Sequence, residues 1–218
     1  MLPIGDDNSG RRTFPIVTYA LILLNVLFFV IEFNNSEAFI LRWAFVPARF
    51  LASPLTEFVT IFSSMFMHAG WLHLGSNMLY LWIFGDNVED RFGHLQFLIF
   101  YLLCGIGAMF VQMMFMLNST VPTLGASGAI AGVLGAYLFL FPRQQVRVLL
   151  GYFISSVSAV IVIGMWIILQ LFSGIGTIAT TSMDTGGVAY MAHVGGFFVG
   201  LVITMLFAGR KPRLPLPM

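Results

Sequence analysis

Hydrophobic residues in this chain fall into long runs that are separated by short polar or Pro/Gly-rich breaks. A helix needs about 20 apolar residues to cross the hydrocarbon core of a bilayer, and several of the runs approach or exceed that length. The sequence therefore predicts six membrane-spanning helices, at residues 15–33, 71–85, 95–117, 127–141, 148–172 and 188–208.

The segment 34–70, between the first two predicted spans, is too apolar for a solvated linker and contains Phe39, Trp43 and Phe58. Apolar segments that do not span a bilayer are stable in the membrane interface, where their side chains reach the lipid. We expect this segment to form a first external loop that is embedded in the membrane.

The composition is typical of a single integral membrane domain, because 59% of the 218 residues are hydrophobic and only 9% are charged. The expected fold class is an all-α membrane protein, built as a bundle of six transmembrane helices. The net charge of +1 provides no basic surface, so we expect no nucleic-acid partner. The single cysteine, Cys104, excludes an intrachain disulfide and a metal cluster built from thiolates.

Lys and Arg residues are unevenly distributed between the two predicted sides of the membrane. Arg42 and Arg49 fall on one side, and the eight others fall on the side that holds both termini. Because positively charged loops are retained in the cytoplasm, both termini are predicted to be cytoplasmic. The expected organisation is a cytoplasmic tail at residues 1–14, a six-helix domain at 15–208 and a second cytoplasmic tail at 209–218.

Two polar residues, Ser127 and His193, lie inside these apolar runs. Polar side chains at membrane depth are costly, so they tend to face a protein interior or a water-filled cavity. Ser127 lies 14 residues before Phe141, and His193 lies 15 residues before Ala208. At about 1.5 Å per residue, both lie roughly 21–23 Å from the inner ends of their helices. The two residues are therefore predicted to share a depth.

Glycine pairs spaced four residues apart begin beside both polar residues: Gly128 with Gly132, and Gly196 with Gly200. Small residues at this spacing let helix backbones approach closely within a membrane. If these two faces pack against each other, the serine hydroxyl and the imidazole become hydrogen-bond partners.

Such a pair has the chemistry of a nucleophile and its base. A serine hydroxyl is a weak nucleophile until an adjacent base accepts its proton, and a neutral imidazole can do so. No acidic residue is predicted at a depth where it could orient His193, since Asp184 falls in the loop before the last span. His73 and Asn77 are four residues apart and share a helix face. Both could donate hydrogen bonds to the oxyanion of an acyl-transfer intermediate.

In their order and spacing, these residues resemble the rhomboid family of intramembrane serine proteases. The resemblance covers most of the chain and rests on four fragments: His68–Asn77, Glu89–Arg91, Gly125–Gly128, and Ala192–Gly196 followed by Gly200.

The resemblance implies a role for each matching residue. Ser127 would be the nucleophile, His193 the base and then the acid, and His73 and Asn77 the oxyanion donors. Further residues would be structural near the site: Gly125, Gly128, Gly132, Gly196 and Gly200, with Glu89 and Arg91 as a structural pair.

The resemblance also implies an environment and a substrate. The chain would lie in a lipid bilayer and would cleave transmembrane protein substrates. We separately expect a prokaryotic plasma membrane, no cofactor and no metal. Substrates would enter laterally near the span 148–172, beneath a mobile cap formed by the loop 173–187.

Two departures from the family pattern stand out. Many members carry an aromatic residue four positions after the nucleophile, which stacks on the catalytic imidazole, whereas this chain has Ala131. Many also carry a Trp-Arg pair in the first external loop, where this chain has Val59 and Thr60. Support for the His193 ring must therefore come from another residue.

Structural roles are the alternatives for individual residues. Ser127 could be a helix N-cap, His193 could be satisfied by a backbone carbonyl, and Asn77 could bridge two helices. A zinc site at His68 and His73 is disfavoured because five-residue spacing puts them on different faces of a helix.

Two other function classes remain open alongside the peptidase. A catalytically silent rhomboid-like protein would bind membrane clients, although such relatives typically lack the serine or the histidine. A small transporter would need a path open to both sides of the membrane.

Overall fold

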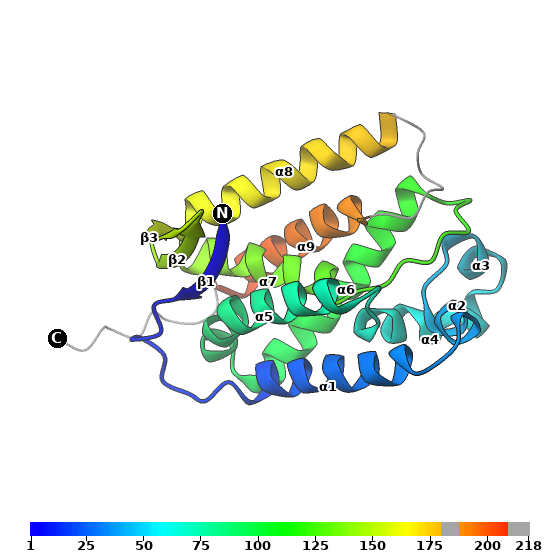
Figure 1. Ribbon diagram of the computed structural model, residues 1–218, viewed down its shortest axis with the longest axis horizontal. Coiled ribbons are helices and arrows are strands. Elements are labelled where there is room, and N and C mark those ends of the chain that lie inside the picture. The colour runs from blue at the N-terminus through cyan, green and yellow to red at the C-terminus, as the bar shows by residue number, and fades with distance from the viewer. Residues whose placement is uncertain (180–187, 209–218) are drawn as a thin grey trace.

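The computed structural model describes residues 1–179 and 188–208. Figure 1 shows long helices running side by side, with α1 and α8 on opposite sides of the bundle and the others between them. The long helices are α1 (Ile16–Phe33), α5 (Trp71–Phe92), α6 (His94–Phe115), α7 (Ser127–Leu140), α8 (Ala159–Ala179) and α9 (Tyr190–Ala208). Each corresponds to one of the predicted runs.

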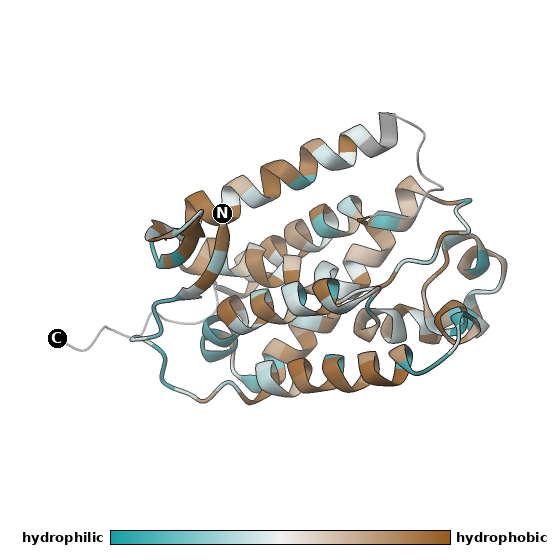
Figure 2. Cartoon of the chain, viewed as in Figure 1, coloured by the Kyte–Doolittle hydropathy of each residue, from teal (hydrophilic) through white to brown (hydrophobic). Residues whose placement is uncertain are grey.

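Within the described residues, four of these helices are long and apolar enough to cross a membrane. The four are α1, α6, α8 and α9, and Figure 2 shows hydrophobic residues along most of α1 and α8. The chain is therefore an integral multi-pass membrane protein. Helix α7 has only 14 residues, but every residue from Gly128 to Tyr137 is buried, so its neighbours rather than lipid surround it.

The segment 34–70 forms short helices that gather at one end of the bundle (Figure 1). They are α2 (Glu37–Trp43), α3 (Pro47–Ala52), α4 (Pro54–Ser63) and the 3₁₀ helix η1 (Ser64–Phe66). Arg49 links them, because its guanidinium pairs with the Glu57 carboxylate at 2.6 Å and donates to the carbonyl oxygens of Leu41 and Ala44. Arg49 thus holds together a loop that lacks the family's Trp-Arg pair. The location of segment 34–70 in the membrane interface stays a prediction.

A three-stranded antiparallel sheet at the other end of the bundle corrects the all-α expectation. Its order is β1-β2-β3, with β1 (Leu2–Asp6), β2 (Gln145–Leu150) and β3 (Phe153–Ser158). In β2 the buried Val146 and Val148 alternate with the exposed Gln145 and Arg147, which is the pattern of a strand.

The span predicted at 148–172 was therefore wrong at its start. Gly151, with φ at +61°, turns the chain between β2 and β3, and α8 begins only at Ala159. An apolar run of this kind does not distinguish a strand from a buried helix segment. At its other end α8 extends through Ala179, so residues 173–179 of the expected cap are helical. The rest of the expected cap, and Asp184, lie outside the described residues.

The N-terminal segment packs against the sheet end of the bundle instead of extending freely. The Asp6 carboxylate accepts hydrogen bonds from Asn87 Nδ2 at 2.6 Å and from the Tyr137 hydroxyl at 2.7 Å. Burial raises the pKa of Asp6 to about 6. Arg11 pairs with Asp86 on α5. Strand β1 is thereby attached to both α5 and α7, while the domain boundary at residue 15 stays a prediction.

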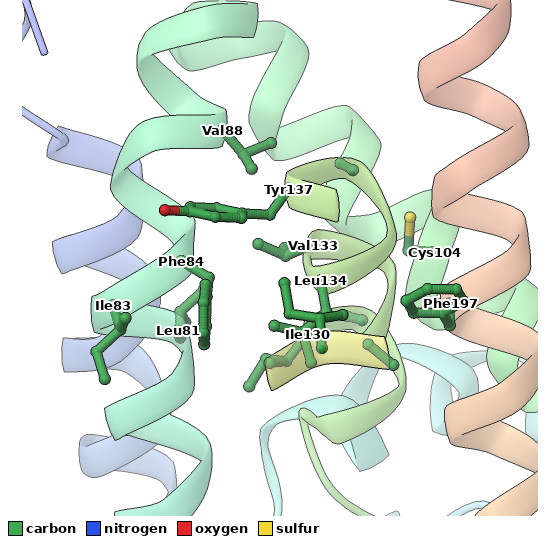
Figure 3. Close-up of a cluster of buried hydrophobic side chains, with 14 of the residues drawn as sticks. Leu81, Ile83, Phe84, Val88, Cys104, Ile130, Val133, Leu134, Tyr137 and Phe197 are labelled. Atoms are coloured by element: carbon green, nitrogen blue, oxygen red, sulfur yellow. The ribbon is translucent and has the colours of Figure 1, made fainter. Parts of the chain in front are cut away.

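The hydrophobic core lies between α5, α6, α7 and α9. Figure 3 shows Phe84 of α5 facing Val133 and Leu134 of α7, with Phe197 of α9 on the other side of α7. The ring of Tyr137 meets that of Phe84 edge-on, with 5.0 Å between the centroids. This core fixes the position of α7 relative to both neighbouring helices.

Helices α7 and α9 touch through backbone atoms at the predicted glycine faces. A Cβ atom added to Gly196 would lie 2.0 Å from the Gly128 carbonyl oxygen, and one added to Gly200 would lie 2.2 Å from that of Gly132. No side chain fits at either position, so the expected close packing is confirmed.

Replacing Gly200 by Ala should separate α7 from α9, because backbone atoms cannot rotate away from the new methyl group. We expect the free energy of unfolding to fall by at least about 2–3 kcal/mol, as for an overpacked core. Gly164→Ala is the matched control, since nothing lies within 4 Å of a Cβ at that position of α8. Thermal unfolding in detergent micelles measures both variants. Equal unfolding midpoints for the two variants would contradict the close packing.

Candidate active site

The hydroxyl of Ser127 and the imidazole of His193 lie in direct contact. Ser127 Oγ and His193 Nε2 are 2.8 Å apart, where α7 begins and within the first turns of α9. His193 is buried, with 9% of its surface exposed, whereas Ser127 is only partly buried. The contact predicted from the two glycine faces is confirmed, while the catalytic roles of the two residues stay a prediction.

Gly125 shapes the chain just before Ser127. Its φ of +129° lies in a region that side-chain-bearing residues rarely adopt, and its N–H donates to the Ser64 carbonyl at 2.8 Å. A Cβ at this position would lie 3.0 Å from His73 Nε2 and 3.5 Å from Ser127 Oγ. The glycine therefore keeps open a space that both His73 and Ser127 border.

His73 and Asn77 both come from α5. The Ala69 N–H donates to His73 Nδ1 at 3.3 Å, so in the neutral ring Nε2 carries the proton and is available as a donor. Nδ2 of Asn77 is buried and has no hydrogen-bond partner among the described residues. Buried polar groups are normally paired, so an unpaired amide suggests a place for an acceptor. The oxyanion role of both residues stays a prediction.

Two residues of α8 support the His193 ring, and sequence reasoning missed both. His193 Nδ1 lies 2.8 Å from Gln170 Oε1, and the Trp166 ring lies 5.9 Å from the imidazole, tilted by 33°. Trp166 and Gln170 are four residues apart and so share a helix face. A glutamine in an otherwise apolar run was the available signal. Trp166 provides the aromatic contact to the His193 ring that Ala131 is too small to provide.

A pocket opens beside Ser127 and is lined mainly by small residues. Two methionines, Met65 and Met109, form part of its wall. The glycine and alanine residues that line it are Gly105, Ala108, Gly125, Gly128, Ala129, Ala189 and Ala192. Its cavity volume of about 10 Å³ is close to the space that one water molecule needs.

Glu89 joins two helices, and its carboxylate contacts residues other than Arg91, with which the resemblance pairs it. Its buried carboxylate accepts the N–H groups of Val17 and Thr18, at 2.9 and 2.7 Å, and lies 2.5 Å from His94 Nδ1. Residues two apart on a helix point in different directions, which explains the missing pair. Glu89 thus anchors the start of α1 to the end of α5.

His68 and His73 are neighbours, contrary to the helix-face argument. His68 precedes α5 in non-helical backbone, and its ring centroid lies 5.1 Å from that of His73. Within residues 1–179 and 188–208, no three His, Cys, Asp or Glu side chains lie close enough to hold a metal ion.

Comparison with known proteins gives the family. A family model described as the rhomboid domain matches residues 55–210. "Rhomboid protein 1, mitochondrial" of Saccharomyces cerevisiae is 30% identical over 191 residues, which cover 85% of this chain and 51% of that protein. "Rhomboid protease GluP" of Bacillus subtilis is 30% identical over 206 residues, covering 92% of this chain and 37% of that protein.

A plant relative is similar to this chain at the same level of identity. "Rhomboid-like protein 11, chloroplastic" of Arabidopsis thaliana is 30% identical over 158 residues, covering 70% of this chain and 52% of that protein. The chain thus spans about half of the length of these relatives, or less. On the match of the domain model and of these relatives, the chain belongs to the rhomboid family.

Proposed function

We propose that this chain is an intramembrane serine endopeptidase that hydrolyses peptide bonds in or near transmembrane segments of membrane-anchored proteins. The observation that supports this most strongly is the 2.8 Å contact between Ser127 Oγ and His193 Nε2 in a chain of the rhomboid family. A relative in this family is named a rhomboid protease, and rhomboids are generally serine proteases. Proximity of a hydroxyl to a neutral imidazole is what nucleophilic catalysis by serine requires.

The reaction begins with attack of Ser127 Oγ on the scissile carbonyl carbon while His193 Nε2 accepts the hydroxyl proton. The carbonyl oxygen becomes an oxyanion that accepts hydrogen bonds from His73 Nε2 and Asn77 Nδ2. When the C–N bond breaks, the imidazolium returns the proton to the leaving amine. Water then attacks the acyl-serine while the same nitrogen accepts its proton, and that proton passes to Ser127 Oγ as the acid product leaves.

The pocket beside Ser127 favours a small residue before the scissile bond, because its cavity volume is only about 10 Å³. A peptide bond in a regular helix has its carbonyl hydrogen-bonded and sterically enclosed. Preferred substrates therefore contain helix-weakening residues around the cleavage point. The proposed location is a prokaryotic plasma membrane, with both termini in the cytoplasm.

Ser127→Ala and His193→Ala should each abolish cleavage while the fold persists, because each removes one half of the proton transfer. We expect turnover to fall by more than about a thousandfold in both variants. The measurement is cleavage of a panel of transmembrane substrates in liposomes, with the cut mapped by mass spectrometry. Ser156→Ala, at an exposed position of β3, is the matched control and should cleave normally.

Retained cleavage by purified Ser127→Ala would refute the assignment. If the wild-type protein binds transmembrane clients and cleaves none of them, the catalytically silent alternative is supported instead.

Asn77→Ala should lower kcat by about a hundred- to a thousandfold with little change in KM, because the donor acts only once negative charge develops. Asn34→Ala, at an exposed position after α1, should leave kcat unchanged. The comparison uses the same liposome assay together with thermal unfolding. If Asn77 only bridges helices, the variant will instead unfold at a lower temperature with a normal kcat per folded molecule.

A further inference from the structure

Gln170 is an unusual residue for its position in α8. All residues of this helix from Ala159 to Leu169 are apolar or glycine, as are Leu171 and Phe172. A polar side chain in such a helix is costly unless a partner satisfies it. The observed partner is His193 Nδ1 on α9, 2.8 Å from Gln170 Oε1. The imidazole is therefore held at both nitrogens, by Ser127 on one side and by Gln170 on the other.

We propose that Gln170 is a positioning residue, whose amide oxygen holds His193 in the one neutral tautomer that can accept the Ser127 proton. The inference rests on the proposed peptidase function and names a third member of its proton-transfer group. When Gln170 Oε1 accepts a hydrogen bond, the imidazole proton must be on Nδ1. Nε2 then presents its lone pair to the Ser127 hydroxyl. A carboxylate plays the corresponding role in the Ser-His-Asp triads of other proteases.

The orientation of the Gln170 amide decides whether His193 can accept the Ser127 proton. If the amide turned over, its NH₂ group would donate to Nδ1 and the ring proton would be on Nε2. The imidazole would then donate to Ser127 Oγ and could not accept its proton. Only one orientation of Gln170 supports catalysis, which makes the tautomer of His193 the quantity to measure.

Trp166 lies on the same face of α8 as Gln170 and restricts the movement of the His193 ring. Its indole lies 5.9 Å from the imidazole at an interplanar angle of 33°, one helical turn before Gln170. The residue that could have stacked from α7 is Ala131, which is fully buried and too short to do so. Both supports of His193 therefore come from α8, so the geometry of the base depends on how α8 packs against α9.

The first test measures the wild-type protein, with one variant used only to assign the signal. Nitrogen-15 NMR of the whole chain in lipid nanodiscs, with labelled histidine, reports which ring nitrogen of His193 carries the proton. We expect Nδ1–H for neutral His193, assigned by comparison with His193→Ala. A proton on Nε2 would overturn the proposal.

The second test compares variants of α8. Gln170→Met keeps the length of the side chain but removes the acceptor, and we expect kcat to fall about ten- to a hundredfold with KM unchanged. Gln170→Glu restores an acceptor and should recover most of the rate, together with the Nδ1–H signal. Leu169→Met, at an exposed position next to Gln170, is the matched control and should cleave like the wild type.

The outcomes separate this inference from the peptidase assignment. If cleavage requires Ser127 but Gln170→Met keeps both the wild-type kcat and the Nδ1–H signal, the positioning role is wrong and the peptidase stands. If the wild type does not cleave, the peptidase assignment fails. Loss of the Nδ1–H signal in Gln170→Met would still show that Gln170 sets the His193 tautomer.

Discussion

Close packing of α7 against α9 is the constraint on which the rest of the structure depends. In a bilayer the lipid tails are as apolar as the helix surfaces, so helices associate through tight packing and polar contacts rather than through the hydrophobic effect. Gly196 and Gly200 bring the α9 backbone against the carbonyl oxygens of Gly128 and Gly132. Ser127 adjoins the first of these contacts and His193 lies three residues before Gly196. The distance between hydroxyl and imidazole is therefore set by backbone contact at these glycines.

Polar side chains whose exposure to lipid would cost free energy lie beside the contact between α7 and α9. The Ser127 hydroxyl, the His193 ring and the Gln170 amide form one chain of hydrogen-bond contacts across α7, α9 and α8. On the α5 side, Asn77 Nδ2 has no partner within the described residues. In a preorganised site the nucleophile and base are already hydrogen-bonded, while the oxyanion donor is still unpaired. The Asn77 amide would become paired only when negative charge develops on a substrate.

The sequence predicted the features that depend on local spacing. The glycine pairs and the polar residues beside them were sufficient to place Ser127 against His193, and apolar run lengths located the long helices. Features that depend on contacts distant in sequence were missed. The pairing of β1 with β2 joins residues 2–6 to residues 146–149. Residues 145–148 alternate polar and apolar side chains as a strand does, but nothing local in either segment indicates its partner.

The same limit explains the missed partners of His193. Gln170 and Trp166 lie on a different helix from His193 and at least 23 residues away in the chain, so no local spacing indicates that they face the imidazole. Gln170 stands out as a polar residue in an apolar run, but the sequence does not show which side chain it meets. The missing Glu89–Arg91 pair is a local error, since their spacing on a helix already argues against contact.

The most direct measurement is covalent labelling of the chain in liposomes with a fluorophosphonate, which reacts with serines that an adjacent base activates. Peptide mapping by mass spectrometry then locates the adduct. We expect a single adduct on Ser127 that forms in the wild type and is lost in His193→Ala. Labelling of Ser127 that is equally fast without the imidazole, or no adduct on Ser127 in the folded wild type, would contradict an activated serine at the α7–α9 contact.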